Sequence, residues 1–227
     1  MVEVIVFAEG PTEEKFIERL VSPARRHLQV FVKPQTLYTS QTAKGGAVTF
    51  DRLKFNARNT LRQHPDAVLS IFLDLYALDT DFPASEEARH KPDIYSRITF
   101  LEQGMKETIV AHVQCRPERF VPPIQPYKFE GLLFSGVQAL SAVEPTWTKS
   151  IATLTKIRTS TETPGHINDG YETTPSRRLE DPLHPQYQKT THRPRAAERI
   201  SSEIIESECK HFKAWMDTVR RLATPSS

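Results

Sequence analysis

Two apolar runs of this chain each end in a carboxylate. Residues 4–8 are followed by Glu9, and residues 67–73 are followed by Asp74. Apolar runs of this length without polar alternation are typical of strands buried on both faces of a parallel sheet. Because sites in parallel sheets form beyond the carboxyl ends of the strands, we expect Glu9 and Asp74 to face one crevice.

Further acids follow at positions that can reach the same crevice. Glu13 lies four residues after Glu9 in a predicted first helical turn, and Glu130 follows the next candidate strand. Crowded carboxylates raise each other's pKa, and a hard divalent cation relieves their repulsion. We therefore predict a Mg²⁺ or Mn²⁺ site whose ligands come from Glu9, Glu13, Asp74, Asp79, Asp81 and Glu130, with Glu9, Glu13, Asp74 and Glu130 as the catalytic residues.

Each acid also has an ordinary explanation. Glu13 can complement the positive end of a helix, and Asp74 can cap a turn or helix. Asp79 and Asp81 can be plain loop residues. The placement of two acids at two buried strand ends favours the metal site over these alternatives.

Polar and positive residues at three places in the chain could hold phosphate. An Asn-Asp-Gly turn precedes a predicted helix start at Thr174 and Pro175. Arginine in a first helical turn is unfavourable unless an anion binds there, although a solvated helix end is the alternative. The predicted phosphate or nucleic-acid contacts are Ser176, Arg177, Arg178, Lys128 and, beside two glycines, Lys44. The basic stretch 188–199 is predicted to be an exposed linker into the last helix.

Strand and helix patterns alternate over the first 135 residues. We predict strands at 2–8, 30–38, 67–74 and 119–125, the last interrupted by prolines, with helices at 12–27, 50–61 and 93–110. This alternation predicts an α/β fold with a mostly parallel sheet flanked by helices. The remainder is predicted as helices at 137–143, 147–158, 175–181 and 195–223, joined by polar segments at 159–174 and 182–194. We expect an α/β core over 1–135 and a helical C-terminal region over 136–227 packed on it.

The composition indicates a soluble cytoplasmic protein. The chain of 227 residues is 38% hydrophobic, carries a net charge of +2 and contains no run of membrane-spanning length. Cys115 and Cys209 have no CxxC spacing, which argues against a disulfide framework or zinc site. No leader-like segment precedes the first apolar run. The mild positive charge permits a nucleic-acid partner without requiring one.

Six segments in this order resemble a known family. They are "EGPTEEKFIERLV", "GGAVTFDRLK", "DLYALDTDFP", "FEGLLFS", "INDGYETTPSRRL" and "CKHFKAWM". The family consists of small TOPRIM-like bacterial proteins assigned to a domain of unknown function, often encoded near AAA or SMC-like ATPases in defence loci. TOPRIM is the metal-binding module of topoisomerases, primases and old-family nucleases. The resemblance covers nearly the whole chain and implies a TOPRIM-like fold, Mg²⁺ or Mn²⁺, and an ATPase partner.

The resemblance assigns roles to individual acids. Glu9 matches the TOPRIM glutamate, and Glu13 matches the second acid of the family's E-G-x-T-E pattern. Asp74 matches the first aspartate of D-x-D, but Tyr76 stands in place of the second. Glu130 matches the second glutamate of H-E-F-E-A-L-L-F, where this chain has Tyr-Lys in place of His-Glu. These departures put a two-metal arrangement in doubt unless Asp79 or Asp81 substitutes.

Several functions remain open at this point. The first is a metal-dependent nuclease that hydrolyses DNA or RNA as an effector of antiphage defence with an ATPase partner. The alternative is a degenerate TOPRIM module that binds nucleic acid or docks and regulates the ATPase. A nucleotide-processing enzyme, or a tyrosine nucleophile at Tyr76, Tyr127 or Tyr171, is less favoured. A homo-oligomer is compatible with the sequence.

Overall fold

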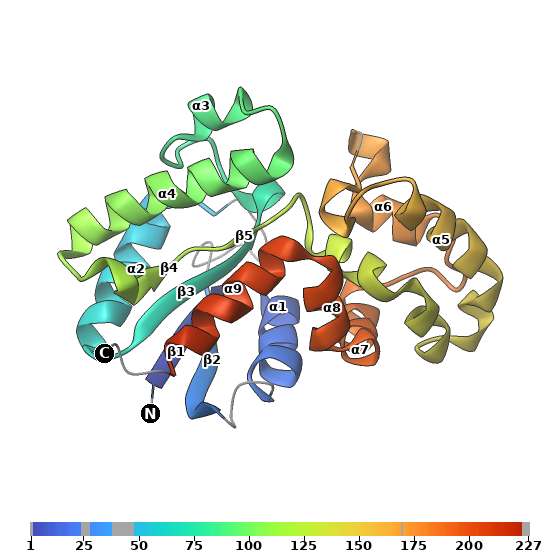
Figure 1. The fold of residues 1–227 in the computed structure, drawn as a ribbon, viewed down its shortest axis with the longest axis horizontal. Helices are drawn as coiled ribbons and strands as arrows, with labels where there is room; N and C mark the ends of the chain where they lie inside the picture. The colour runs from blue at the N-terminus through green and yellow to red at the C-terminus, as the bar shows by residue number, and fades with distance from the viewer. Residues whose placement is uncertain (1, 24–27, 38–47, 169, 224–227) are drawn as a thin grey trace, which may run out of the picture.

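The computed structural model describes residues 2–23, 28–37, 48–168 and 170–223. It has a parallel sheet with helices on both faces, and a helical lobe beside the sheet (Figure 1). The predicted fold class, an α/β fold with a mostly parallel sheet flanked by helices, is confirmed. Within the described residues, no helix combines the length and the apolar character that crossing a membrane requires.

The sheet is built around β1 (Val2–Ala8), which pairs in parallel with β2 (Val30–Thr36) and β3 (Val68–Asp74). Two short strands, β4 (Phe120–Val121) and β5 (Ile124–Gln125), add in parallel to β3. The residues between β4 and β5 are both proline, and neither can donate a backbone hydrogen bond to the sheet. The prolines therefore split the predicted strand 119–125 into two.

The sheet is covered on both faces, which explains the unbroken apolar runs. One face packs against α2 (Phe50–Gln63) and α4 (Ile94–Val113), with α3 (Ser85–Arg89) beside α4. The other face packs against α9 (Lys210–Arg221) and against α1 (Pro11–Phe16), which continues as a π-helical turn to Val21. Alternate residues of β1 enter the two cores and are at most 4% exposed from Val4 to Ala8.

A buried polar contact joins α9 to the sheet. Ser70 of β3 is fully buried, and its Oγ donates to the carbonyl oxygen of Val121 at 2.7 Å. The same Oγ accepts a hydrogen bond from Trp215 Nε1 of α9 at 3.0 Å. The buried hydroxyl of Ser70 and the buried indole N–H of Trp215 therefore both have hydrogen-bond partners, as burial requires.

The C-terminal half consists of short helices. A 3-10 segment (Phe129–Ala142) leads through a second one (Pro145–Ser150) to α5 (Ile151–Thr159), and further along lie α6 (Pro175–Glu180), α7 (Lys189–Ile200) and α8 (Ser202–Glu208). Shorter 3-10 turns occur at Leu75–Ala77, Pro117–Arg119, Pro164–His166 and Tyr171–Thr173. One buried cluster contains residues from both predicted parts, 1–135 and 136–227, whose status as separate domains stays a prediction.

Two predictions about the last third of the chain are wrong. The helix predicted over 195–223 is three helices, because the backbone turns at Ser201, where φ is +78°, and again at Cys209. The exposed linker predicted over 188–199 is α7, which packs on α1 and on the 3-10 segment. Pro194 lies inside α7, so a rule that ends helices before proline fails here.

Candidate active site at the carboxyl edge of the sheet

The structure brings four of the predicted acids together. β1 and β3 are adjacent and parallel, with Ala8 opposite Phe72, so Glu9 and Asp74 leave the sheet at the same edge. Pro11 starts α1 immediately afterwards, which places Glu13 at this edge as well. Glu130 arrives from the segment that follows β5. We call Glu9, Glu13, Asp74 and Glu130 the four-acid cluster.

An arginine that the sequence analysis missed lies inside this cluster. Arg193 of α7 donates through Nη1 to Glu13, and through Nε and Nη2 to Glu130 Oε1 at 3.1 and 2.6 Å. Its guanidinium also lies 4.7 Å from the centre of the Phe129 ring. Burial alone would lower the pKa of Arg193, but Glu130 and Glu13 outweigh it and raise that pKa. Arg193 therefore stays charged although only 6% of it is exposed.

Negative charge exceeds positive charge in the cluster. Burial, and then repulsion from Glu13, raise the pKa of Glu9 despite the opposing effect of Arg193 and Lys128. Burial raises the pKa of Asp74 well above its usual value, and the other three acids add to that effect against Arg193. Burial also raises the pKa of Glu13 although it pairs with Arg193. The cluster can therefore accept a further cation or proton.

One oxygen of the cluster points to the same conclusion. Glu130 is fully buried, and its Oε2 has no hydrogen-bond partner, while Oε1 accepts from Arg193. Buried polar atoms nearly always have a partner, so an orphaned carboxylate oxygen suggests a missing donor, water or ion.

The remaining predicted acids have structural contacts of their own. Asp81 Oδ2 accepts from the backbone N–H of Phe50 at 2.8 Å, at the first residue of α2. Asp79 Oδ1 accepts from the backbone N–H of Thr80 at 2.7 Å. These contacts stabilise the loop after β3, and they match the ordinary loop roles weighed against metal binding.

A basic pocket adjoins the four-acid cluster. It has a volume of about 590 Å³ and is lined by Tyr76, Lys128, Gly170, Thr174, Ser176, Arg177, Glu180 and Lys189. Tyr76 is two residues beyond Asp74, and Lys128 acts electrostatically on Glu9, so the pocket lies close to the cluster, although none of the four acids lines it. We call this cavity the basic pocket.

The predicted phosphate contacts divide between this pocket and other places. Lys128, Ser176 and Arg177 line the basic pocket, and Ser176 is buried with its Oγ 3.4 Å from that of Thr174. Arg178 is half-buried and does not line the pocket. Lys44 lies outside the described residues. Lys189 was missed because it begins α7, within the stretch taken for a linker.

Sequence comparison places the whole of this site in one family. The chain matches the model of a domain of unknown function, DUF4276, over residues 8–220. The chain belongs to this family. The DUF4276 match spans the four-acid cluster, Arg193 and the basic pocket. No curated protein and no solved structure matches the chain.

The four-acid cluster of this DUF4276 protein fits a metal ion only in part. Among the residues that the structure describes, no group of three or more Asp, Glu, His or Cys side chains is arranged to hold one. Arg193 already donates hydrogen bonds to Glu13 and to one carboxylate oxygen of Glu130. Mg²⁺, however, is commonly held by only one or two carboxylates together with substrate phosphates. The orphaned Glu130 Oε2 and the raised pKa values of Glu9 and Asp74 fit that kind of binding.

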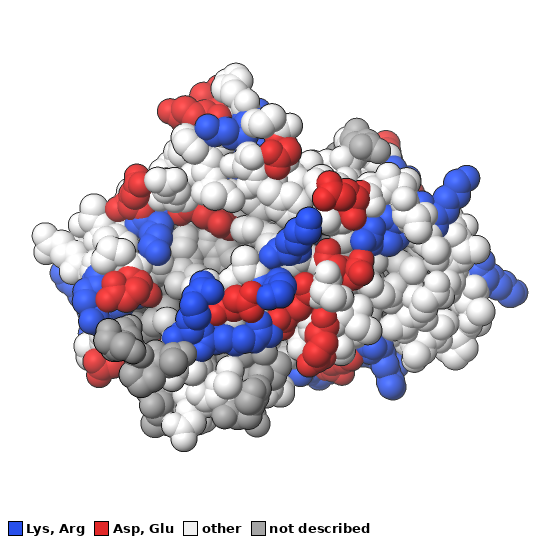
Figure 2. Space-filling model, in the orientation of Figure 1, with Lys and Arg blue, Asp and Glu red and all other residues white. Residues whose placement is uncertain are grey.

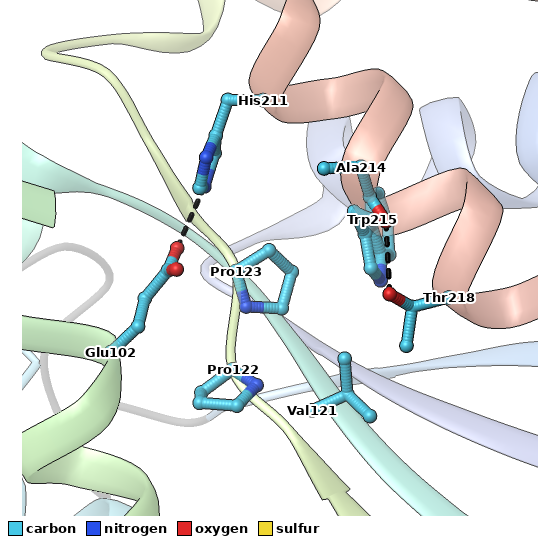
Figure 3. Close-up of a pocket in the computed structure, with 8 residues that line it drawn as sticks. All are labelled: Glu102, Val121, Pro122, Pro123, His211, Ala214, Trp215 and Thr218. Atoms are coloured by element: carbon cyan, nitrogen blue, oxygen red, sulfur yellow. Dashed lines mark hydrogen bonds and ion pairs between the residues drawn. The ribbon is translucent and has the colours of Figure 1, made fainter. Parts of the chain in front are cut away.

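A second recess of the DUF4276 chain lies between α4 and α9 (Figure 3). Its volume is about 140 Å³, and the side chains of Pro122, Pro123 and Trp215 contribute to its walls. Glu102 Oε1 accepts from both His211 Nε2 at 2.7 Å and the backbone N–H of Ile124 at 2.6 Å. This carboxylate therefore connects α4, α9 and β5, which is a structural role.

Charge on the outer face of this DUF4276 protein is mixed. In Figure 2, lysines and arginines alternate with acids over α8 and α9. Lys213 pairs with Asp217 at 2.5 Å, and Arg220 pairs with both Asp217 and Glu206. This face offers no continuous basic surface, so the basic pocket is the better candidate for phosphate.

Proposed function

We propose that this DUF4276 protein is a Mg²⁺- or Mn²⁺-dependent nuclease that hydrolyses phosphodiester bonds of DNA or RNA. The observation that carries the proposal is that an acidic cluster lies close to a basic pocket. The acids outnumber the positive groups among them, and the pocket beside them carries Lys128, Arg177 and Lys189. A metal-assisted phosphodiesterase needs both acidic and basic groups, because it must hold a cation and a phosphate side by side.

The proposal assigns a different role to each group of residues at the site. Glu9 and Asp74, together with Glu130 Oε2, would hold the metal, which when bound polarises the phosphate and lowers the pKa of a water. Lys128 and Lys189 would hold the phosphate in the basic pocket. Arg193 holds Glu13 and Glu130 in place through charge-assisted hydrogen bonds. Burial and Glu13 raise the pKa of Glu9, a direction that suits it to accept a proton during hydrolysis.

Cleavage assays on purified protein test this proposal. Labelled single-stranded DNA, duplex DNA and RNA would be incubated with Mn²⁺ or Mg²⁺, with mononucleotides included to detect a nucleotide-processing activity. Glu9→Gln and Asp74→Asn should abolish cleavage, while Glu14→Gln, a neighbouring acid of α1 outside the cluster, should retain it. Cleavage that persists in both cluster variants would refute the assignment.

A second candidate function is favoured by Arg193. Because Arg193 already neutralises two carboxylates, the site can instead be a degenerate module that binds nucleic acid or docks and regulates an ATPase. Calorimetric titration of Mn²⁺ separates the two candidates when a non-cleavable phosphorothioate oligonucleotide is present. Mn²⁺ binding that Asp74→Asn abolishes supports the nuclease, and an oligonucleotide complex that takes up no Mn²⁺ supports the degenerate module.

The biological setting is a proposal supported by the resemblance to TOPRIM-like proteins. It comprises a TOPRIM-type site, an AAA or SMC-like ATPase partner and a role in antiphage defence. Co-expression with an ATPase encoded beside the gene, followed by joint purification, tests the partner. Phage challenge of cells carrying wild-type or Asp74→Asn protein tests the role, and equal protection by both would argue against a nuclease effector.

A further inference from the structure

The basic pocket contains an exposed aromatic ring. Tyr76 follows β3 in the turn Leu75–Ala77 and is 45% exposed. This exposure leaves part of the ring available to a ligand. In this chain it occupies the position where the TOPRIM pattern has a second aspartate.

The ring of Tyr76 is held in a fixed position. Its hydroxyl accepts a hydrogen bond from Asn168 Nδ2 at 2.8 Å, and its backbone N–H donates to the carbonyl oxygen of Tyr127 at 3.2 Å. The two tyrosine rings lie with centroids 5.5 Å apart and are tilted by 50°. Two side-chain contacts and one backbone hydrogen bond thus position the residue before any ligand arrives, which reduces the entropy lost on binding.

The surroundings of Tyr76 identify the class of ligand. Lys128 and Lys189 line the same pocket, and Glu180 is the acid among its lining residues. A flat aromatic face beside lysines suits a nucleobase attached to a phosphate, since bases stack on aromatic side chains and phosphates bind lysine. At about 590 Å³, the pocket lies in the range that holds one small ligand.

A base can reach such a ring only when it has left a duplex. Bases inside a double helix are already stacked on their neighbours, and taking one out requires unpairing and unstacking. Single strands present their base faces at little cost. We propose that the basic pocket binds single-stranded nucleic acid, with a base stacked on Tyr76 and the flanking phosphates on Lys128 and Lys189. The inference rests on the proposed function for the identity of the substrate as a polynucleotide.

Binding without metal tests this inference separately from catalysis. Fluorescence anisotropy in EDTA would compare labelled oligo-dT, oligo-rU and a duplex of equal length. The two single strands distinguish DNA from RNA, and at least one should bind about 10-fold or more tightly than the duplex. Tyr76→Leu should weaken single-strand binding by roughly 5- to 100-fold, the effect of losing one stacked base, and Tyr76→Phe should retain most of it.

Two further variants sharpen the measurement. Phe55→Leu removes an aromatic ring that is 64% exposed on α2, away from the pocket, and should bind like the wild type. Lys128→Gln should weaken all sequences alike and reduce the slope of log affinity against log salt by about 0.7, the value for one phosphate contact on a single strand. Circular dichroism of each variant checks that it is folded.

The outcomes separate this inference from the nuclease proposal. Duplex binding as tight as single-strand binding would overturn the inference, and so would a Tyr76→Leu variant that binds like Phe55→Leu. Cleavage that needs Glu9 but is unchanged in Tyr76→Leu would leave the nuclease standing and reject the stacking site. Single-strand binding that needs Tyr76, without cleavage in Mn²⁺, would support the stacking site and reject the nuclease.

Discussion

Replacing Arg193 by methionine tests the account of the four-acid cluster most directly. Methionine keeps a long side chain, so the change removes the charge and its hydrogen bonds with little loss of packing volume. It leaves Glu13 and Glu130, which are 7% and 0% exposed, without their cationic partner. Removing one partner of a buried ion pair typically costs about 3–5 kcal/mol.

This magnitude predicts a measurable loss of thermal stability. For a chain of 227 residues, 1 kcal/mol shifts the melting temperature by roughly 2–4 °C, so Arg193→Met should melt about 6–20 °C below the wild type at neutral pH. The control is Arg195→Met, an exposed arginine two residues further along α7, which should melt like the wild type. Differential scanning calorimetry provides the comparison.

The pH dependence of the variant follows from the same geometry. Without Arg193, protonation of Glu13 becomes more favourable, which raises its folded-state pKa further above the unfolded value. A folded state that binds more protons than the unfolded one loses stability as pH rises. The difference between Arg193→Met and Arg195→Met should therefore shrink when the pH is lowered toward the unfolded pKa of glutamate. If Arg193→Met and Arg195→Met melted at the same temperature at neutral pH, the stabilising role of the buried ion pair would be refuted.

Three other substitutions test separate parts of the structure. Asp74→Asn removes a buried acid whose raised pKa costs stability at neutral pH. In EDTA this variant should therefore melt at a higher temperature than the wild type at neutral pH, and calorimetry should find that the gain fades as the pH falls toward the unfolded pKa of aspartate. Ser70→Ala leaves the buried Trp215 Nε1 without its acceptor and should cost about 1–3 kcal/mol in urea unfolding. Arg119 donates to three backbone carbonyls around the end of α2. Lysine lacks the planar fork, so Arg119→Lys should lower the urea midpoint by an amount equivalent to about 1 kcal/mol.

The sheet and the positions of two of the acids could be predicted from the sequence, because local sequence pattern determines both. The apolar runs ending at Glu9 and Asp74 have no polar alternation, and strands buried on both faces produce that pattern. Once β1 and β3 pair in parallel, the convergence of the two acids follows from geometry. Glu13 follows as well, because α1 starts immediately after β1.

The position of Arg193 in the cluster could not be predicted from local sequence pattern. The stretch around it is polar and contains Pro194, and both features locally favour an exposed linker. The helix forms there because tertiary contacts with α1 and with the 3-10 segment outweigh those local preferences. The one signal available was the excess of acids at the strand ends, which a buried arginine could neutralise as well as a metal ion could.

The ion pair between Arg193 and Glu13 joins positions 180 residues apart in the chain. At typical synthesis rates of about 5–20 residues per second, Glu13 leaves the ribosome on the order of 10–40 s before Arg193 does. During that interval the nascent α/β half lacks the arginine that contacts Glu13 and Glu130 in the folded chain. The site therefore assembles only after most of the chain has been made, and a partial translation product lacks the residue that holds the acids in place.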